Sequence, residues 1–364
     1  MARIVQLANF VAPTSGGIRT CLDALAAGYH AAGHERILVV PGERDRIVDD
    51  RIELRAPRLP GQPYRVLLDR ARVRDVVTRV GADRIEVSDK LTLPAIGRLD
   101  PPAVLLSHER LDAILRPRVP PLVPLGAVAN VANRRIAAPF DRVVCASGFA
   151  AEEWRRIGVE PTVVPLGVDL ETFHPGAADP VLWPREHDVE LVCCGRLSTE
   201  KRPGAALAAL VALAEGGVDA RLTFAGAGPL RSRLARAARL HDVTVRFTDH
   251  LAGRDEVAAL LASSDVAICP CPHETFGLAA LEALACGTPV VVPTGGALHE
   301  LVDRGPMGCG IVDDDLATGV VLARRCCTRD AARAAAVALP WSATVAGLLD
   351  AHRLAPAPVA AVVA

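Results

Sequence analysis

Two carboxylates, Glu274 and Glu282, stand eight positions apart with a glycine turn between them and an apolar run on either side. This pattern predicts a strand, a loop that carries Glu274, a helix that carries Glu282, and a second strand. The amides of Phe276, Gly277 and Leu278 are expected at the helix start, where unpaired N–H groups and the helix dipole favour a phosphate. A carboxylate on each side of a phosphate site suits a sugar nucleotide, because carboxylates accept hydrogen bonds from sugar and ribose hydroxyls.

A second charged segment follows another predicted strand and contains Arg196, Glu200 and Lys201. Two cations on one loop can stabilise the charge that develops on a departing nucleoside diphosphate, and they can replace a metal ion there. Lys201 is notable because the chain has only two lysines and otherwise uses arginine. The alternative interpretation is a helix start at which Glu200 pairs with neighbouring arginines.

The order of these residues resembles a known family. The pattern His-Glu-x-Phe-Gly-Leu-x-x-x-Glu that begins at His273 is similar to the donor-site signature of retaining GT-B glycosyltransferases of family 4. The pattern Gly-Arg-x-x-x-Glu-Lys that begins at Gly195 resembles a second motif of that family. The alternative for the first motif is an ordinary strand–turn–helix with two solvated glutamates.

The resemblance implies an α/β fold of the GT-B class. Two Rossmann-like, doubly wound domains would face each other across a cleft, and a C-terminal helix would cross back to the first domain. We expect an N-terminal acceptor-side domain at 1–165, a nucleotide-sugar-binding domain at 166–340, and the crossover helix and tail at 341–364. The length of 364 residues agrees with two domains.

The resemblance also implies a set of site residues. His108 follows a predicted strand, at the edge where ligands bind in open α/β sheets, and the family places a histidine near the donor sugar. Packing at the strand end is its alternative role, and plain turns are the alternative for the glycines. The implied catalytic residues are His108, Arg196, Lys201 and Glu274, and the implied donor-binding residues are Gly16, Gly17, Arg196, Lys201, Gly228, Glu274, Phe276, Gly277, Leu278 and Glu282.

Segments outside the donor motifs resemble one particular branch of the family. The runs that begin at Val5, Glu86 and Ser107 are similar to those of actinobacterial mannosyltransferases that act on phosphatidylinositol mannosides. This implies GDP-mannose as donor, a phosphatidylinositol mannoside-type glycolipid as acceptor, and an α-glycosidic product. Other branches of the family use UDP-sugars or soluble acceptors, and the donor motifs do not separate the branches.

Three further functions remain as alternatives. A family 4 transferase could use another sugar nucleotide and a soluble or secondary-metabolite acceptor. A GT-B sugar-nucleotide epimerase shares the diphosphate site but needs acid and base residues at C2 of the sugar, for which His108 is the one candidate. A non-catalytic nucleotide-sugar-binding protein would not need the intact set of charged residues. A Rossmann dehydrogenase is disfavoured, because no GxGxxG follows the first predicted strand.

Composition limits the partners. The net charge of −1 provides no global field for nucleic acid. Ten cysteines occur without the spacing of a zinc site, and Asp313, Asp314 and Asp315 are interpreted as a solvated loop. We therefore expect no metal and no other cofactor. The absence of a long apolar run or a signal peptide predicts a cytoplasmic enzyme.

Apolar periodicity predicts the elements that position the site. We expect strands at 4–8, 37–40, 84–87, 104–107, 142–145, 189–194, 220–225, 243–248, 266–268 and 290–293. A helix is expected at 18–32, and loops are expected at 56–63 and 116–126. The arginine-rich segment 64–80 is predicted to be an amphipathic helix, which could lie on an anionic membrane on the inner face of the plasma membrane or simply expose its charges to water.

Overall fold

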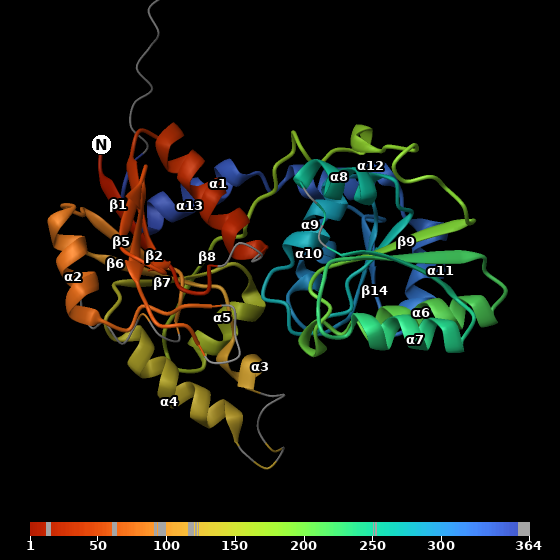
Figure 1. Cartoon of the computed structure of the whole chain (residues 1–364), viewed down its shortest axis with the longest axis horizontal. Helices are drawn as coiled ribbons and strands as arrows, with labels where there is room; N and C mark the ends of the chain where they lie inside the picture. The colour runs from red at the N-terminus through yellow and green to blue at the C-terminus, as the bar shows by residue number, and fades with distance from the viewer. Residues whose placement is uncertain are drawn as a thin grey trace, which may run out of the picture. The chain divides into compact units, whose positions relative to one another are not determined.

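A computed structural model describes residues 1–11, 16–59, 64–90, 93, 100–115, 120, 122, 124–249, 251 and 253–355. The chain forms two compact units (Figure 1). Unit 1 contains Met1–Leu166 together with Trp341–Ala364, and unit 2 contains Gly167–Pro340. The last helix, α13 (Trp341–Ala351), therefore belongs to the first unit, as expected for the GT-B class.

Unit 1 is built on an eight-stranded sheet with the order β3-β4-β2-β1-β5-β6-β7-β8. Neighbouring strands are parallel except for the β3–β4 pair at the edge, which is antiparallel. The strands are β1 (Arg3–Leu7), β2 (Glu35–Gly42), β3 (Arg46–Val48), β4 (Arg51–Arg55), β5 (Arg84–Val87), β6 (Ala103–Ser107), β7 (Arg142–Cys145) and β8 (Thr162–Val163).

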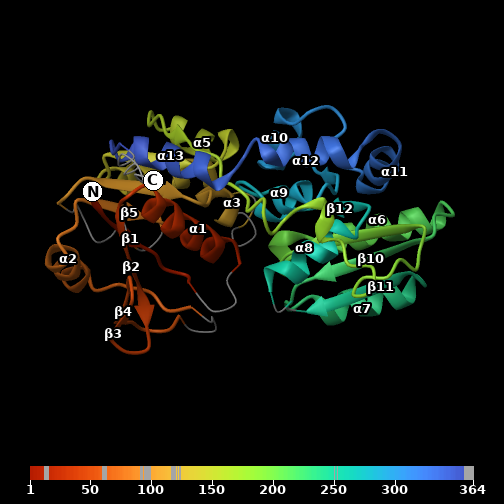
Figure 2. The same ribbon diagram turned by 90° about the horizontal axis from the view of Figure 1, so that it is seen from above.

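The helices of unit 1 cover this sheet and are visible from two directions in Figures 1 and 2. Helix α13 packs against α1, where the two backbones approach so closely that a Cβ at Gly28 would lie 2.2 Å from Val345 Cγ2. The central strands are buried on both faces and are rich in Val, Leu and Ile, as parallel sheets require. The helices are α1 (Gly17–Ala31), α2 (Arg70–Arg79), α3 (Leu111–Leu115), α4 (Leu125–Ala137), α5 (Gly148–Arg155) and α13.

Unit 2 is built on a six-stranded, fully parallel sheet with the order β11-β10-β9-β12-β13-β14. The strand order reverses between β9 and β12, which is where open α/β sheets bind ligands. The strands are β9 (Val189–Cys194), β10 (Ala220–Ala225), β11 (Thr244–Asp249), β12 (Val266–Ile268), β13 (Val290–Val292) and β14 (Gly310–Val312).

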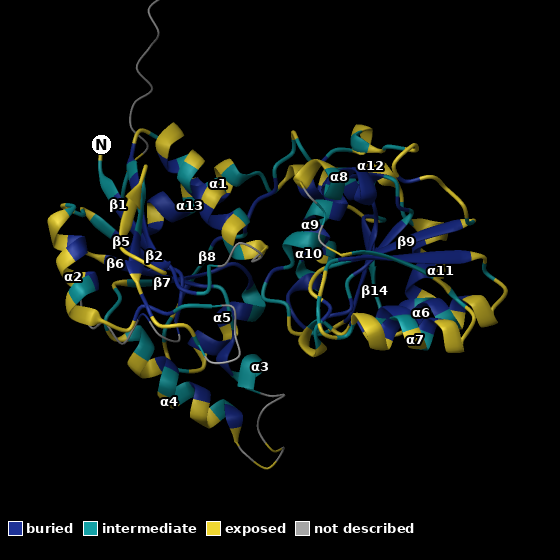
Figure 3. Ribbon diagram, in the orientation of Figure 1, coloured by how far each residue is buried: buried dark blue, intermediate teal, exposed yellow. Residues whose placement is uncertain are grey.

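The helices of unit 2 alternate with its strands, and Figure 3 shows β9 buried and the outer helices largely exposed, whereas the edge strand β11 is exposed or intermediate. The core consists mainly of aliphatic side chains, in agreement with an aromatic content of only 3%. The helices are η3 (Pro175–Ala177), η4 (Thr199–Lys201), α6 (Pro203–Glu215), α7 (Arg231–Leu240), α8 (Arg254–Ala262), α9 (Leu278–Ala285), α10 (Leu298–Arg304), α11 (Leu316–Cys326) and α12 (Arg329–Val337).

The predicted helix at 64–80 was wrong over its first part. Helix α2 begins only at Arg70, because the Asp69 side chain caps it by accepting from the Arg72 amide at 3.1 Å. Before this point the chain is extended: Arg65 forms a bridge with Arg58, and the Leu67 amide donates to Asn9 Oδ1 at 2.9 Å. The alternation of apolar and charged residues continues on both sides of Asp69, so the sequence pattern does not show where the helix begins.

Two other expectations need correction. The β3–β4 hairpin was not predicted, because its charged sequence lacks an apolar run. Helix α4 starts at Leu125, inside the predicted loop 116–126. Residues 60–63, 116–119, 121 and 123 of the two predicted loops lie outside the described residues. No helix in the described part of the chain is both long and apolar enough to cross a bilayer.

Candidate active site

The loops that follow β9 and β12 meet at the point where the strand order of unit 2 reverses. Lys201, at the end of η4, donates through Nζ to Glu274 Oε1 in an ion pair. The Cys271 thiol joins the same two loops by donating to the Glu200 carbonyl at 3.3 Å. The structure therefore brings together Lys201 and Glu274, which lie 73 positions apart in sequence.

The charge state of Lys201 depends on its partner. Burial disfavours the ammonium, but the charge and hydrogen bond of Glu274 outweigh burial and hold the pKa of Lys201 above its ordinary value. The lysine is thus a fixed cation at neutral pH. An incoming diphosphate would meet a cation that is already positioned, which is the arrangement that stabilises developing negative charge.

Arg196 lies on the same loop but points to a different partner. Its guanidinium lies 3.4 Å from Glu200 Oε1, and both side chains are largely exposed. This pairing is the alternative that the sequence left open, and an exposed pair of this kind contributes little to stability. Arg196 can therefore leave Glu200 at a small cost in free energy when an anion binds.

Gly277 sets the start of helix α9. Its φ of 98° lies in the left-handed region, and a Cβ there would stand 2.2 Å from Leu298 Cδ2, so only glycine fits. The first helical bonds run from the Ala280 and Leu281 amides to the Gly277 carbonyl. In the described chain, the amides of Phe276, Gly277 and Leu278 donate to no backbone carbonyl, so they are available to an anion.

Glu282 lies one turn inside α9 and is partly buried. Burial raises its pKa to about 7, while Arg254 partly opposes this effect. Within the described residues, no side chain or amide donates a hydrogen bond to its carboxylate. A desolvated acceptor without its own donors suits a ligand that supplies two hydroxyl groups, such as a ribose diol.

Gly228 has a packing role that the sequence did not reveal. A Cβ at this position would lie 2.5 Å from the Leu197 carbonyl oxygen, and the Leu230 amide donates to the same oxygen at 3.0 Å. The glycine loop after β10 thus supports the loop that carries Arg196. Direct contact of Gly228 with a donor stays a prediction.

In unit 1, Gly16 and Gly17 form the start of α1. Gly16 is the N-cap residue, its carbonyl accepts from the Thr20 amide at 3.2 Å, and both glycines are exposed. Among the atoms of the described residues, none lies within 4 Å of a Cβ built at Gly16, so no described side chain covers this helix start. Residues 12–15 of the same predicted loop lie outside the described residues.

His108 directly follows β6 at the carboxyl edge of the sheet. Burial lowers its pKa to about 4, although the negative charge of Glu86 acts in the opposite direction. The imidazole is therefore neutral at physiological pH. A neutral ring can exchange a hydrogen bond with a sugar hydroxyl, but it cannot supply a positive charge.

A buried ion pair at the start of α3 was missed by the sequence analysis. Lys90 Nζ lies 2.5 Å from Glu153 Oε2, the two side chains are 1% and 0% exposed, and Lys90 stacks 5.1 Å from the Trp154 ring centre. The other oxygen of Glu153 accepts from the Leu111 and Asp112 amides at 2.7 and 3.1 Å. The pair thus fixes the first residues of α3, which begins three positions after His108. The rarity of lysine in this chain was the signal that could have revealed it.

A second buried network connects the first strands to the end of the chain. Glu86 accepts from Gln6 Nε2 and the Tyr29 hydroxyl, each at 2.6 Å, and lies 3.3 Å from His352 Nε2. All four side chains are buried. The network holds the segment after α13 against β1, α1 and β5, which support the strand edge with His108.

The acidic run and the cysteines have structural roles. Asp315 caps α11 by accepting from Ala317 and Thr318, and Asp314 binds Thr294 at 2.7 Å. All ten cysteines are free thiols. Within the described residues, no group of three or more His, Cys, Asp or Glu side chains is arranged to hold a metal ion.

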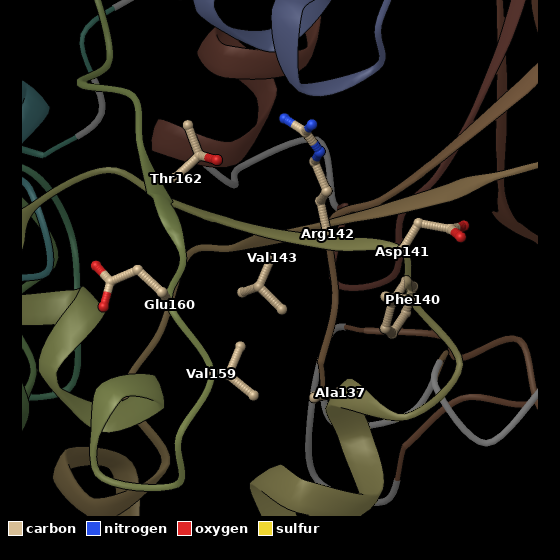
Figure 4. A pocket seen from close by; sticks show the side chains of 8 residues that line it. All are labelled: Ala137, Phe140, Asp141, Arg142, Val143, Val159, Glu160 and Thr162. Carbon is tan, nitrogen blue, oxygen red and sulfur yellow. The ribbon is translucent and has the colours of Figure 1, made fainter.

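A cavity of about 280 Å³ in unit 1 lies apart from the predicted site residues (Figure 4). Arg142, at the start of β7, lines it, which places the cavity at the amino-terminal edge of that strand, whereas His108 follows the carboxyl end of β6. It is lined by Ala137, Phe140, Asp141, Arg142, Val143, Val159, Glu160 and Thr162.

Comparison with known proteins identifies the family. Residues 15–172 match the model described as Glycosyltransferase Family 4, and residues 188–326 match Glycosyl transferases group 1. Over 321 residues the chain is 48% identical to the GDP-mannose-dependent alpha-(1-6)-phosphatidylinositol dimannoside mannosyltransferase of Mycobacterium tuberculosis (strain ATCC 25177 / H37Ra), covering 84% of this chain and 83% of that protein. The chain belongs to glycosyltransferase family 4.

More distant similarities agree with this assignment. The glycosyltransferase is 33% identical over 250 residues to D-inositol 3-phosphate glycosyltransferase of Saccharomonospora viridis, covering 61% of this chain and 58% of that protein. Sucrose-phosphate synthase from Thermosynechococcus elongatus aligns with a TM-score of 0.79 at 18% identity, over 97% of this chain and 98% of its own. The lipopolysaccharide glycosyltransferase WaaG aligns with a TM-score of 0.71 at 17% identity, over 96% and 99%. These structures establish the GT-B fold of the enzyme.

Proposed function

We propose that this family 4 glycosyltransferase transfers mannose from GDP-mannose to a phosphatidylinositol mannoside-type glycolipid and forms an α-glycosidic bond with retention of configuration. The observation that carries the proposal is the 48% identity to the mycobacterial dimannoside mannosyltransferase, which extends over 84% of the chain and thus includes both units. The arrangement of charges in unit 2 supports a sugar-nucleotide donor.

Unit 2 would hold the donor. Glu282 accepts from the ribose hydroxyls, and the amides at the start of α9 bind the diphosphate together with Lys201 and Arg196. The diphosphate takes Lys201 as a partner, which frees Glu274 to accept from hydroxyl groups of the sugar. Each of these groups already lies at the reversal point of the sheet, so little reorganisation is required.

Unit 1 would contribute the second half of the site. The open start of α1 at Gly16 and Gly17 offers amides to the diphosphate, and neutral His108 contacts the mannose near its reacting carbon. The acceptor hydroxyl oxygen forms the new bond to C1 on the face from which the diphosphate leaves. The C1–O bond to phosphate breaks, and the departing phosphate oxygen takes the hydroxyl proton. In this route Glu274 and Glu282 bind hydroxyl groups of the donor, and neither forms a covalent bond to the sugar. The acceptor attacks C1 directly, so no nucleophile from the protein is needed.

The test is a metal-free turnover assay of the purified enzyme. GDP-mannose, UDP-glucose and UDP-N-acetylglucosamine are each supplied with and without phosphatidylinositol mannosides, and nucleotide release and product mass are measured. We expect GDP release that depends on the acceptor, a lipid heavier by one mannose, and an α-anomeric proton signal. Turnover only with a UDP-sugar, or conversion of the donor without acceptor, contradicts the proposal; the second result would indicate an epimerase.

We also propose that the enzyme acts in the cytoplasm at an anionic membrane surface, because a glycolipid acceptor is itself part of a membrane. The arginine-rich segment 64–80 is poorly suited to this contact. Arg65 pairs with Glu43, Arg72 with Asp45, and Arg79 with Asp75, so several of its charges are already neutralised within the fold. Another surface of unit 1 fits the role better.

A further inference from the structure

Helix α4 exposes apolar side chains along the face that it turns away from the protein. Its buried residues Leu125, Ala129 and Asn133 recur every four positions and form one stripe. Val128 and Val131 lie on the opposite side and are 47% and 51% exposed. Leu122, shortly before the helix, is 96% exposed. In Figure 3 exposed residues alternate with intermediate and buried ones along α4, as expected for a helix with one outer face.

The stretch of sequence that contains α4 carries charge of a single sign, and the acids of the helices packed against it, Asp112 and Glu152 among them, are paired with Arg110. Residues 113–140 contain four arginines and no Asp or Glu, and they form the longest acid-free stretch of the chain. Arg134 and Arg135 are exposed in the last part of the helix, and no acid in the described residues pairs with either of them. Helix α4 thus differs from α2, where Arg72 pairs with Asp45 and Arg79 with Asp75.

The position of α4 relates it to the acceptor half of the site. Helix α3 begins at Leu111, three positions after His108, and packs against α4. Both helices belong to unit 1, so the relation does not depend on how the two units are placed. A surface formed by α4 therefore lies close to the strand edge where the acceptor is expected.

We infer that α4 is a membrane-docking surface, on which Val128 and Val131 contact the interfacial region of a bilayer and Arg134 and Arg135 bind anionic lipid phosphates. The inference rests on the proposed function, because a lipid acceptor requires such a surface. Exposed apolar residues beside arginines, on a helix that has no acid of its own, are the features that favour an anionic lipid surface over water. We call this surface, consisting of Leu122, Val128, Val131, Arg134 and Arg135, the α4 face.

The test compares binding of the full-length enzyme to phosphatidylcholine vesicles with and without phosphatidylglycerol, measured by flotation. Wild type should bind only the anionic vesicles. Arg134→Ala/Arg135→Ala should weaken binding roughly 30-fold, since each arginine near an anionic surface contributes about a 5-fold factor. Val128→Ser/Val131→Ser should also weaken binding, because it removes the apolar contact.

Matched controls identify the surface. Arg70→Ala/Arg74→Ala removes the same charge from α2, and Val321→Ser/Leu322→Ser removes exposed apolar groups from α11. Both should bind vesicles like wild type, and thermal unfolding should be unchanged in all four variants. Equal binding by the α4 variants and wild type overturns the inference. Weaker vesicle binding by the α2 variant alone also overturns it. So does a wild-type protein that does not bind anionic vesicles.

Two further measurements distinguish this inference from the proposed transferase activity and from self-association of the protein. The α4 variants should keep wild-type GDP release with a detergent-solubilised acceptor, because they leave the donor site intact. Vesicle binding that depends on α4 without any mannosyl transfer would refute the proposed function and retain the docking surface. If sedimentation shows a dimer that the α4 variants disrupt and vesicles do not bind, the face serves self-association and the inference fails.

Discussion

At the scale of single residues, the Lys201–Glu274 pair is the main feature of the site. Glu274→Ala and Lys201→Ala should each reduce kcat/KM roughly 10²–10³-fold, the range observed when one group that stabilises developing charge is removed. The double variant should lose less than the product of the single effects, because the two side chains form one ion pair. Steady-state kinetics with GDP-mannose measures this, with exposed Arg324→Ala as the control. Near wild-type rates in both single variants would contradict the site assignment.

Glu282 makes stability depend on pH. Its folded pKa of about 7 lies above the ordinary value of 4.5, so the folded chain binds this proton more tightly than the unfolded chain. The carboxyl therefore favours folding below about pH 5, and this contribution is lost as pH rises to about 7 and above. Glu282→Gln removes the effect. Relative to this variant, wild type should lose about 1–3 kcal/mol of unfolding free energy between about pH 5 and pH 8.

Urea denaturation of both proteins across this pH range measures the difference. Parallel pH profiles for wild type and Glu282→Gln would show that the carboxyl does not titrate there. Addition of GDP should reduce the pH dependence of wild type if the ribose supplies the hydrogen-bond donors that Glu282 lacks in the free enzyme.

At the scale of secondary structure, the Lys90–Glu153 pair links the segment after β5 to α5 and to the start of α3. Lys90→Met should destabilise unit 1 by about 3–5 kcal/mol, because it leaves a buried carboxylate without its cation. Lys90→Met/Glu153→Gln should be less destabilised than Lys90→Met alone, since the buried charge is then removed and an acceptor for the Leu111 and Asp112 amides remains. Guanidinium denaturation tests this. Additive effects of the two changes would indicate that the side chains act independently.

The sequence predicted most of the elements, and the reasons for its errors are physical. Most strands of both sheets were found because buried parallel strands are continuous apolar runs, as at 189–194 and 220–225. The short edge strands β8 and β14 were not predicted, because they have only two and three residues. The β3–β4 hairpin escaped because an exposed edge pair has charged side chains. The start of α2 was misplaced because Asp69 is one of many acids that can cap a helix, and only the structure shows which one does.

The candidate site was predicted only in part, for a similar reason. The motifs pointed to Glu274, Glu282 and Lys201, because each of these residues lies within a few positions of a glycine in a short sequence pattern. The supporting contacts of Lys90 and Glu153 join segments 63 positions apart and have no local pattern. The clash that reserves position 228 for glycine involves Leu197, a neighbour only in the folded chain.

At the scale of the whole molecule, unit 1 is completed by a segment that follows unit 2. Removal of residues 341–364 should therefore destabilise unit 1, because Leu348 and Leu349 of α13 are buried and His352 contacts Glu86. Unit 2 should still bind GDP, since its donor residues lie within Gly167–Pro340. Calorimetry with and without GDP tests both statements. An unchanged transition for unit 1 would show that α13 contributes little to its fold.

The same feature has a consequence for synthesis. The strands and helices of residues 1–166 leave the ribosome before any of unit 2, but Glu86 and the groove for α13 remain without their partner until the final helix emerges. At typical elongation rates this interval is on the order of ten seconds or more. Unit 2, whose segments are contiguous, can complete its fold during that time. Unit 2 can thus mature first, and unit 1 is completed only after α13 has been synthesised.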